Sequence, residues 1–300
     1  MTRRLLPLAL TGLVAAGLVA ACEHDPGREI KPGALSVVAT IAPVGALVQA
    51  VGGDQIHLRV LAGSGIDPHE YEVTAQDRRA IEGATVIFRN GLGIDGFLSK
   101  VIDATSSKVT TLTDGLRPRD GPQDRGDPHV WNDPVYDQRM VARIGEVLAA
   151  ADPPNADGYR QRATAYITRL DAVDQEVKEI LATIPPGNRK MVTNHDGFGY
   201  FIEHYGLTYV GAVIPAQTTQ AEPSAKDIRD LVELIKREGV KAIFAESSID
   251  PKVARQVASD TGVKIVDNLY VDTLGAKGSG ADTIDGMLLT NARTIAEALR

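Results

Sequence analysis

The sequence predicts an α/β protein of two lobes, each a mostly parallel sheet flanked by helices, joined by one long rigid backbone helix. The chain has 300 residues, about twice the usual single-domain length of about 150. In both halves, apolar runs of strand length alternate with amphipathic runs of helix length, which is typical of βαβ units. Between the halves, one long stretch keeps helical periodicity without interruption.

Residues 1–34, which precede the first predicted strand, are typical of an exported lipoprotein. Two arginines are followed by an apolar run and then by Cys22, which is the layout of a signal peptide. Residues 19–22, VAAC, resemble a bacterial lipobox. We therefore expect a lipoprotein signal peptide over 1–21, a lipid on Cys22 and a polar tether over 22–34. A membrane-spanning anchor is disfavoured, because the run contains proline and glycine and barely reaches across about 30 Å of hydrocarbon.

The N-terminal lobe is predicted to occupy residues 35–152. Its strands are short runs rich in Val, Ile and Leu, and its helices carry apolar residues three or four positions apart. The strands are expected at 35–41, 56–61, 85–89 and 108–112, and the helices at 44–51, 74–83, 97–104 and 135–150. Residues 113–128 are rich in Pro, Gly and Asp and lack periodicity, so we expect a mobile surface loop there.

A single linking helix is predicted within residues 153–185. Over 154–183 the apolar residues recur at helical spacing, which predicts a helix of about 40 Å. The Pro-Pro-Gly sequence that follows is expected to end it.

The C-terminal lobe, 186–300, repeats the alternating pattern of the first. Its strands are expected at 190–194, 208–213, 242–245 and 264–266, with helices after most of them.

Composition excludes several classes of protein. The chain is 43% hydrophobic and 24% charged with a formal net charge of −7, as in ordinary folded proteins. No basic run is long enough to bind a row of phosphates, which argues against nucleic acid, and the acidic balance favours cations. One cysteine allows neither an intramolecular disulfide nor a CxxC zinc site. A transition-metal site must therefore use histidines and carboxylates.

Four such residues follow predicted strands: His69, His129, His195 and Asp272. In open α/β sheets, ligands bind at the carboxyl ends of the strands. Three imidazoles and one carboxylate can complete the coordination of a divalent transition metal. The alternative is that all four are ordinary polar loop residues.

Three further carboxylates are candidates to support the imidazoles of this cluster, and the other histidines are not. Glu70, Asp196 and Glu246 lie near the four in sequence or strand order, and are candidates to orient the imidazoles. The remaining histidines, His24, His57 and His204, are expected to be surface or half-buried imidazoles without a metal role.

Several local sequences resemble one family. The segments DPHEYEVTAQD, DPHVWNDP, NHDGFGYFIEHYGL, IFAESSI and LYVDTLG resemble, in order, those of the metal-binding (cluster A-I) solute-binding lipoproteins of zinc and manganese ABC transporters. The resemblance implies a rigid linking helix, a metal held between the lobes, and His69, His129, His195 and Asp272 as its ligands. It also implies an extracytoplasmic, lipid-anchored carrier that is not an enzyme and delivers its metal to an ABC permease for import.

The resemblance also bears on the cargo. A histidine at the position of His195 implies Zn²⁺, with Mn²⁺ on the same scaffold as the alternative. Residues 113–128 contain no histidine, whereas many zinc members have a histidine-rich loop there, so a scavenging role for this loop is in doubt. A less favoured alternative is an exported zinc hydrolase, whose catalytic zinc would keep one position open for water. We expect a monomer, and a metallochaperone is left open as a further partner.

Overall fold

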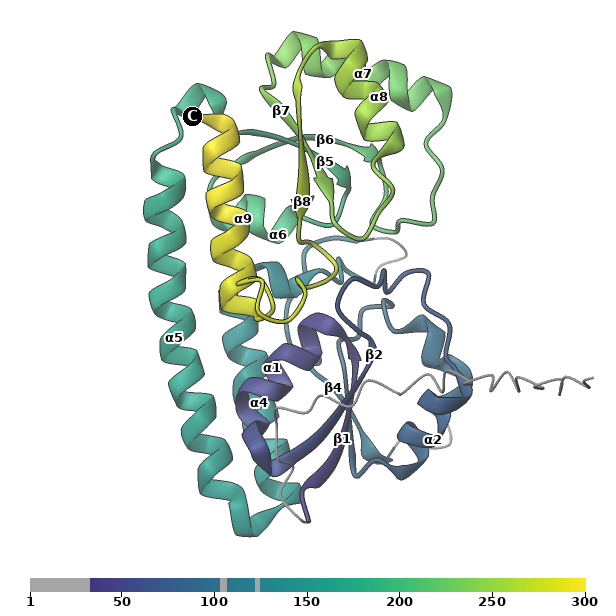
Figure 1. Ribbon diagram of the computed structural model, residues 1–300, viewed down its shortest axis with the longest axis vertical. Coiled ribbons are helices and arrows are strands. Elements are labelled where there is room, and N and C mark those ends of the chain that lie inside the picture. Colours follow the sequence, from purple (N-terminus) through teal and green to yellow (C-terminus); the bar gives the residue numbers. More distant parts are fainter. Residues whose placement is uncertain (1–32, 103–106, 122–124) are drawn as a thin grey trace, which may run out of the picture.

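Figure 1 shows the computed structural model, which describes residues 33–102, 107–121 and 125–300. The predicted signal peptide, Cys22 and most of the tether lie outside the described residues. Two sheet-containing lobes lie one above the other, and a long helix runs beside both. The α/β architecture of two lobes joined by one backbone helix is therefore confirmed.

The sheet of the N-terminal lobe has four strands in the order β2-β1-β3-β4, all parallel. Parallel strands that are buried on both faces have nearly continuous apolar sequences, as in the inner strand Val86–Arg89. The strands are β1 (Leu35–Ile41), β2 (Ile56–Ala62), β3 (Val86–Arg89) and β4 (Val109–Thr111). One face packs on α1 (Ala42–Gly52) and α4 (Pro134–Ala151), and the other on α2 (Ala75–Gly83) and α3 (Ser99–Ile102).

The sheet of the C-terminal lobe repeats this plan with the order β6-β5-β7-β8, again all parallel. Its strands are β5 (Lys190–His195), β6 (Thr208–Ile214), β7 (Ala242–Glu246) and β8 (Lys264–Leu269). The helices α7 (Ala225–Glu238) and α8 (Lys252–Thr261) cover one face, and α6 (Gly199–His204) and α9 (Ile284–Leu299) cover the other. Five 3-10 turns complete the described elements: η1 (Gly53–Gln55), η2 (Gly96–Leu98), η5 (Val130–Asn132), η6 (Pro153–Asn155) and η7 (Pro186–Asn188).

The linking helix is α5 (Ala156–Ala182), whose 27 residues span about 40 Å at 1.5 Å per residue. It packs against α1 and α4 of the N-terminal lobe and against α9 (Figure 1). Leu170, Val173 and Val177 are buried along it, at the predicted spacing. These side chains belong to one continuous apolar core that includes residues of both lobes.

Helix starts follow local sequence rules. The Thr74 side chain accepts a hydrogen bond from the Asp77 N–H and the Asp77 carboxylate accepts one from the Thr74 N–H, forming a capping box at α2. Asp133 caps α4, with Pro134 as its first residue. Both helices therefore start within one residue of the predicted starts at 74 and 135, a few residues after His69 and His129.

Two predicted elements differ from the structure. Over the described part of the helix expected at 97–104, the structure has the 3-10 turn Gly96–Leu98 followed by the short helix Ser99–Ile102, because the Leu98 N–H bonds to the Asp95 carbonyl three residues back. Residues 103 and 104 lie outside the described residues. Strand β8 runs to Leu269, beyond the predicted end at 266, because Leu269 still pairs with Glu246 of β7.

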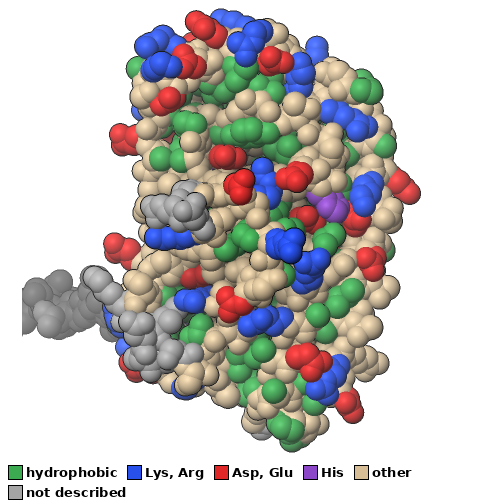
Figure 2. Space-filling view, turned by 180° about the vertical axis from the view of Figure 1, so that it is seen from behind, with side chains coloured by type: hydrophobic (Ala, Val, Ile, Leu, Met, Phe, Trp, Pro, Cys, Tyr) green, Lys and Arg blue, Asp and Glu red, His purple; other side chains and the backbone are tan. Residues whose placement is uncertain are grey.

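Figure 2 shows acidic and basic side chains interspersed over one face of the molecule, so the charge of that face is mixed.

Candidate metal centre

The fold brings the four predicted residues together from four separate segments. His69 lies in the loop after β2, and His129 lies just before η5, between β4 and α4. His195 is the last residue of β5, and Asp272 follows β8. One donor atom from each lies within 4.8 Å of every other. The cluster therefore takes two side chains from each lobe, where the carboxyl ends of the two sheets face each other.

The Asp272 carboxylate lies among the three imidazoles. His69 Nε2 is 3.2 Å and His195 Nε2 is 3.4 Å from its Oδ2, and His129 Nε2 is 3.3 Å from its Oδ1. The Nε2 atoms of His129 and His195 are 3.3 Å apart. Four ligands at about 2.0–2.1 Å from a tetrahedral ion lie about 3.3–3.4 Å from one another. These four contacts are therefore close to the ligand–ligand distances of a small divalent cation, within a donor set that spans up to 4.8 Å.

Several of these atoms lack ordinary partners. The Nε2 of His69 and both carboxylate oxygens of Asp272 make no hydrogen bond of normal geometry among the described residues. Asp272 is 1% exposed. Leaving buried polar atoms unsatisfied costs about 1–3 kcal/mol each, more when they are charged. Unpaired donors that converge on one point are typical of a ligand set.

Two of the imidazoles are oriented by buried carboxylates. His129 Nδ1 is 2.7 Å from Asp127 Oδ1, and His195 Nδ1 is 2.6 Å from Glu246 Oε1. A carboxylate that accepts a bond from Nδ1–H fixes the tautomer and leaves the Nε2 lone pair free for a metal. Glu246 is thus placed beside the cluster in the manner proposed from the sequence.

Asp127 was not among the residues singled out from the sequence, although a signal for it exists. The tripeptide Asp-Pro-His occurs twice, ending at His69 and at His129. In both copies the histidine N–H donates to Oδ1 of the aspartate two residues earlier, at 2.8 Å from Asp67 and 3.0 Å from Asp127. Only the second aspartate also contacts the imidazole of its own motif.

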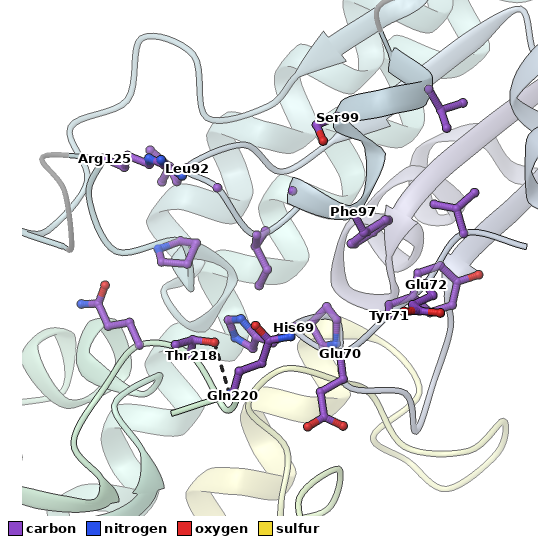
Figure 3. Close-up of a pocket in the computed structure, with 18 of the residues that line it drawn as sticks. His69, Glu70, Tyr71, Glu72, Leu92, Phe97, Ser99, Arg125, Thr218 and Gln220 are labelled. Atoms are coloured by element: carbon purple, nitrogen blue, oxygen red, sulfur yellow. Dashed lines mark hydrogen bonds between the residues drawn. The ribbon is translucent and has the colours of Figure 1, made fainter. Parts of the chain in front are cut away.

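The other two candidate supporting carboxylates lie apart from the rings. Glu70 is exposed, beside His69 in the wall of a pocket (Figure 3). Asp196 is half-buried. Burial and the neighbouring Asp127 carboxylate raise the pKa of Asp196, and the Arg119 guanidinium opposes this. Asp196 therefore lies near Asp127 and Arg119, which adjoin the metal cluster.

The electrostatics of the cluster favour a cation. Burial by itself would raise the pKa of Asp272, but the charges of His195 and His129 hold that pKa well below its usual range. Burial would lower the pKa of His129, yet the carboxylates of Asp272 and Asp127 raise it to about 10. Against burial, Glu246 and Asp272 likewise raise the pKa of His195. A divalent metal and protons therefore compete for the same nitrogens.

A cavity of about 800 Å³ lies at the junction of the lobes (Figure 3). Tyr71 and Phe97 of the N-terminal lobe and Thr218 of the C-terminal lobe are among its lining residues. His69 is the one member of the cluster that lines it. The His69 side chain is 8% exposed, whereas that of Asp272 is 0% exposed. His69 is therefore the member nearest this cavity.

Hydrogen bonds between the lobes fix the loops that carry the cluster. The Trp131 indole Nε1–H donates to the Val271 carbonyl at 2.6 Å. The Gly65 N–H donates to Thr273 Oγ1 at 2.6 Å. Each bond joins a loop near one N-terminal histidine to a residue adjacent to Asp272 in the chain.

The fold and this cluster define a solute-binding protein with a metal site between its lobes, of the kind that serves ABC transporters. The chain belongs to the family described as zinc-uptake complex component A, periplasmic, whose model matches residues 37–298. The resemblance stated from the sequence is thereby confirmed. Because members are substrate-binding proteins of transporters, the hydrolase alternative is dropped, and a membrane permease is implied as the partner.

Curated relatives have similar length and differ in the metal they are named for. The chain is 30% identical to the metal ABC transporter substrate-binding lipoprotein ScbA of Streptococcus cristatus, over 97% of each chain. It is 29% identical to the manganese-binding lipoprotein MntA of Halalkalibacterium halodurans, covering 97% of this chain and 96% of that protein. It is 30% identical to the iron ABC transporter substrate-binding lipoprotein MtsA of Streptococcus pyogenes, over 98% of each.

Solved structures share the fold. The periplasmic zinc-binding protein TroA from Treponema pallidum matches with a TM-score of 0.84 and 30% identity, covering 89% of this chain and 99% of that one. A manganese-bound periplasmic metal-binding protein from Candidatus Liberibacter asiaticus matches with a TM-score of 0.78 and 26% identity, covering 88% and 99%. Within residues 33–102, 107–121 and 125–300, no helix is long and apolar enough to cross a membrane.

Proposed function

We propose that this protein is a high-affinity extracytoplasmic zinc carrier that delivers Zn²⁺ to an ABC permease for import. His69, His129, His195 and Asp272 would be the four ligands. The observation that carries the proposal is the 3.2–3.4 Å spacing of three imidazole nitrogens around one buried carboxylate. Each of these contacts is close in length to the edge of a tetrahedral zinc site, about 3.3–3.4 Å, and one donor atom from each of the four residues lies within 4.8 Å of every other.

The choice of zinc rests on the donor set. Imidazole-rich sites suit zinc better than manganese, which prefers carboxylate, carbonyl and water oxygens. Manganese remains the second candidate for a specific reason. Both Asp272 oxygens face imidazole nitrogens, so the carboxylate could bind through both and raise the coordination number. Two relatives of about 30% identity are named for manganese and for iron.

The membrane attachment is also part of the proposal. Residues 1–21 would be removed as a lipoprotein signal peptide, Cys22 would carry the lipid, and 22–34 would tether the lobes to the membrane. Relatives named as lipoproteins support this assignment. We propose residues 35–152 and 186–300 as the lobes and 153–185 as the link, acting as a monomer.

The test uses the chain from residue 23 onward, which omits the signal peptide and Cys22, purified without added metal. Elemental analysis and competition titration with Zn²⁺, Mn²⁺ and Fe²⁺ would be run on the wild type and on Asp272→Ala. We expect one tightly held Zn²⁺ per chain and a loss of affinity of orders of magnitude in the variant. Asp157→Ala is the matched control, because Asp157 is fully exposed on α5.

Each outcome has a clear meaning. Tighter binding of Mn²⁺ or Fe²⁺ than of Zn²⁺ would keep the carrier and change its cargo. An affinity for all three metals that Asp272→Ala leaves unchanged would remove the cluster from the binding site and contradict the proposal.

A further inference from the structure

We propose that Arg119 is a positioning residue that couples contact between the lobes to the orientation of His129. The proposal rests on the proposed function, in which His129 is a metal ligand. Arg119 lies in the segment 113–128, in which no helix or strand occurs at the described positions. Its side chain is 34% exposed, yet its polar contacts reach both lobes.

The first step is the contact with Asp127. Arg119 Nη1 donates to Asp127 Oδ2 at 2.9 Å, while Oδ1 of the same carboxylate lies 2.7 Å from His129 Nδ1. Asp127 is fully buried, so the guanidinium is a charged partner that holds this carboxylate in place. Hydrogen bonds between charged groups are shorter and about twice as strong as neutral ones. Arg119 therefore fixes the group that orients the imidazole.

The second step is the contact with the C-terminal lobe. Arg119 Nε donates to Glu203 Oε2 on α6 at 2.8 Å. The Tyr200 hydroxyl accepts a bond from the Arg119 N–H at 2.9 Å and donates to the Asp127 carbonyl at 2.8 Å. The guanidinium carbon lies 5.5 Å from the centre of the Tyr200 ring, within range of a cation–π contact. One tyrosine of the C-terminal lobe thus binds both ends of the loop.

The third step is the close contact between the Arg119 guanidinium and the backbone of Gly199 in the C-terminal lobe. A Cβ atom at Gly199 would lie 1.6 Å from Arg119 Nη1. The backbone of α6 can approach the guanidinium this closely only because residue 199 is glycine. The Asp127 N–H also donates to the Arg119 carbonyl at 2.9 Å, which closes the loop on itself. The contact is therefore built into the junction of the lobes.

The contact between Arg119 and Asp127 also affects the charge around the proposed metal site. Three buried carboxylates, Asp127, Glu246 and Asp272, surround the imidazoles. A divalent cation would leave one negative charge among these three carboxylates, and the Arg119 guanidinium, which Asp127 shares with Glu203, lies next to it. If the lobes part, Arg119 loses Glu203 and Tyr200, and its hold on Asp127 weakens. The affinity for metal would then fall as the lobes separate.

The experiment measures rates of metal binding and release by stopped flow with a fluorescent chelator. We expect Arg119→Gln to raise the dissociation rate about 10–100-fold, as loss of a group that supports a ligand does, with little change in the association rate. Circular dichroism of the metal-free variant checks that it is folded, since loss of the charged partner of the buried Asp127 should also lower its thermal unfolding temperature. Arg119→Lys should recover only part of the loss, because an ammonium cannot form the planar fork.

Two further variants test the coupling itself. In an Asp127→Asn background, Arg119→Gln should add little, because both act through one carboxylate. Tyr200→Phe should raise the dissociation rate in the same direction as Arg119→Gln. Arg125→Gln is the matched control in the same loop, since Arg125 is exposed and lines the neighbouring cavity.

The outcomes separate this inference from the proposed function. Tight metal binding by the wild type, with unchanged release in Arg119→Gln, would overturn the inference alone. Additive effects of Arg119→Gln and Asp127→Asn would overturn the link through Asp127, and a silent Tyr200→Phe would overturn the coupling between the lobes. A wild-type chain that binds no metal would instead contradict the proposed function.

Discussion

The imidazole of His129 and the carboxylate of Asp127 form a 2.7 Å contact in which both side chains are fully buried. Water cannot replace either partner there, so the contact fixes the ring that the proposed metal would bind. Asp127 also binds Arg119. This carboxylate is therefore the point at which the cluster and the junction of the lobes meet.

We expect Asp127→Asn to weaken metal binding about 10–100-fold, because the amide keeps the shape but loses the charge that supports His129. Competition titration measures the change. Asp67→Asn is the matched control, since Asp67 holds the same place in its own Asp-Pro-His motif but contacts the His69 backbone N–H. An equal loss in both variants would show that the contact with the imidazole is not the cause.

Glu246→Gln is expected to weaken metal binding by a similar factor, because Glu246 accepts from both the backbone N–H and the Nδ1–H of His195. Glu70→Gln is the control, since Glu70 is exposed at the cavity wall. The measurement is the dissociation constant for Zn²⁺ at fixed pH. A larger effect at Glu70 than at Glu246 would reverse our assignment of the orienting group.

Gly197→Ala should disrupt the site while leaving most of the fold intact. A Cβ at this position would lie 2.4 Å from both Cε1 and Nε2 of His195, so the ring must turn out of the cluster. We expect metal affinity to fall at least 100-fold, against 10–100-fold for a lost supporting group. Gly187→Ala, where a Cβ meets no atom within 4 Å, should bind metal as the wild type does. Circular dichroism checks that both variants are folded.

The pH dependence of stability should contain a contribution from His204. Its ring lies 3.2 Å from Asp133 of the N-terminal lobe and 2.8 Å from Asp174 on α5. The bond to Asp133 raises the pKa of His204, burial opposes this, and the bond to Asp174 raises it further. Lys178 pairs with the same Asp174 carboxylate, and the Tyr205 ring lies against the imidazole.

The sign follows from the raised pKa. A histidine whose pKa is higher when folded stabilises the protein fully below its unfolded pKa of about 6.5, and this contribution is lost as pH rises through the folded pKa. His204→Gln should therefore cost about 1–2 kcal/mol at pH 6, and the deficit should shrink towards pH 9. Chemical denaturation at several pH values measures it. A deficit that grows with pH would contradict the assignment.

Removing the metal should change the overall dimensions little. Helix α5 packs along α1, α4 and α9, so wide opening about a hinge would tear apart buried contacts. We expect small tilts of the lobes and rearrangement of residues 113–128 instead. Small-angle scattering of metal-free and metal-bound protein tests this. A large increase in the radius of gyration on metal removal would show a true hinge.

Much of the fold was predictable because the local signals agree with one another. Strand β1 lies at the predicted residues 35–41, since it is a mostly apolar run, with Ser36 and Thr40 as its polar residues, and is buried from Val37 onward. The capping box at Thr74 fixed the start of α2. The segment 97–104 was predicted less well, because a short stretch with a glycine at its start carries too little periodicity to distinguish a 3-10 turn from an α-helix.

The cluster was predictable for a different reason. His69, His129, His195 and Asp272 each follow a strand, and the carboxyl ends of parallel strands meet at one edge. Arg119 was not identifiable from the sequence, because its partners in the C-terminal lobe are distant. Asp127 lies two residues before His129, and the repeated Asp-Pro-His motif was the local signal for it. The contacts from Arg119 to Tyr200 and Glu203 span 81 and 84 positions, and no periodicity marks Arg119. Contacts of this kind appear only once the lobes are placed together.

The continuous core along α5 has a further consequence for how the chain unfolds. Leu47 of the N-terminal lobe, Val173 of α5 and Leu288 of the C-terminal lobe belong to the same cluster of buried side chains. Two sheets that share one core should melt together, as one cooperative calorimetric transition rather than two. Damage that unfolds either lobe would then expose the whole polypeptide to proteases at once. The chain would be either fully folded or fully degraded.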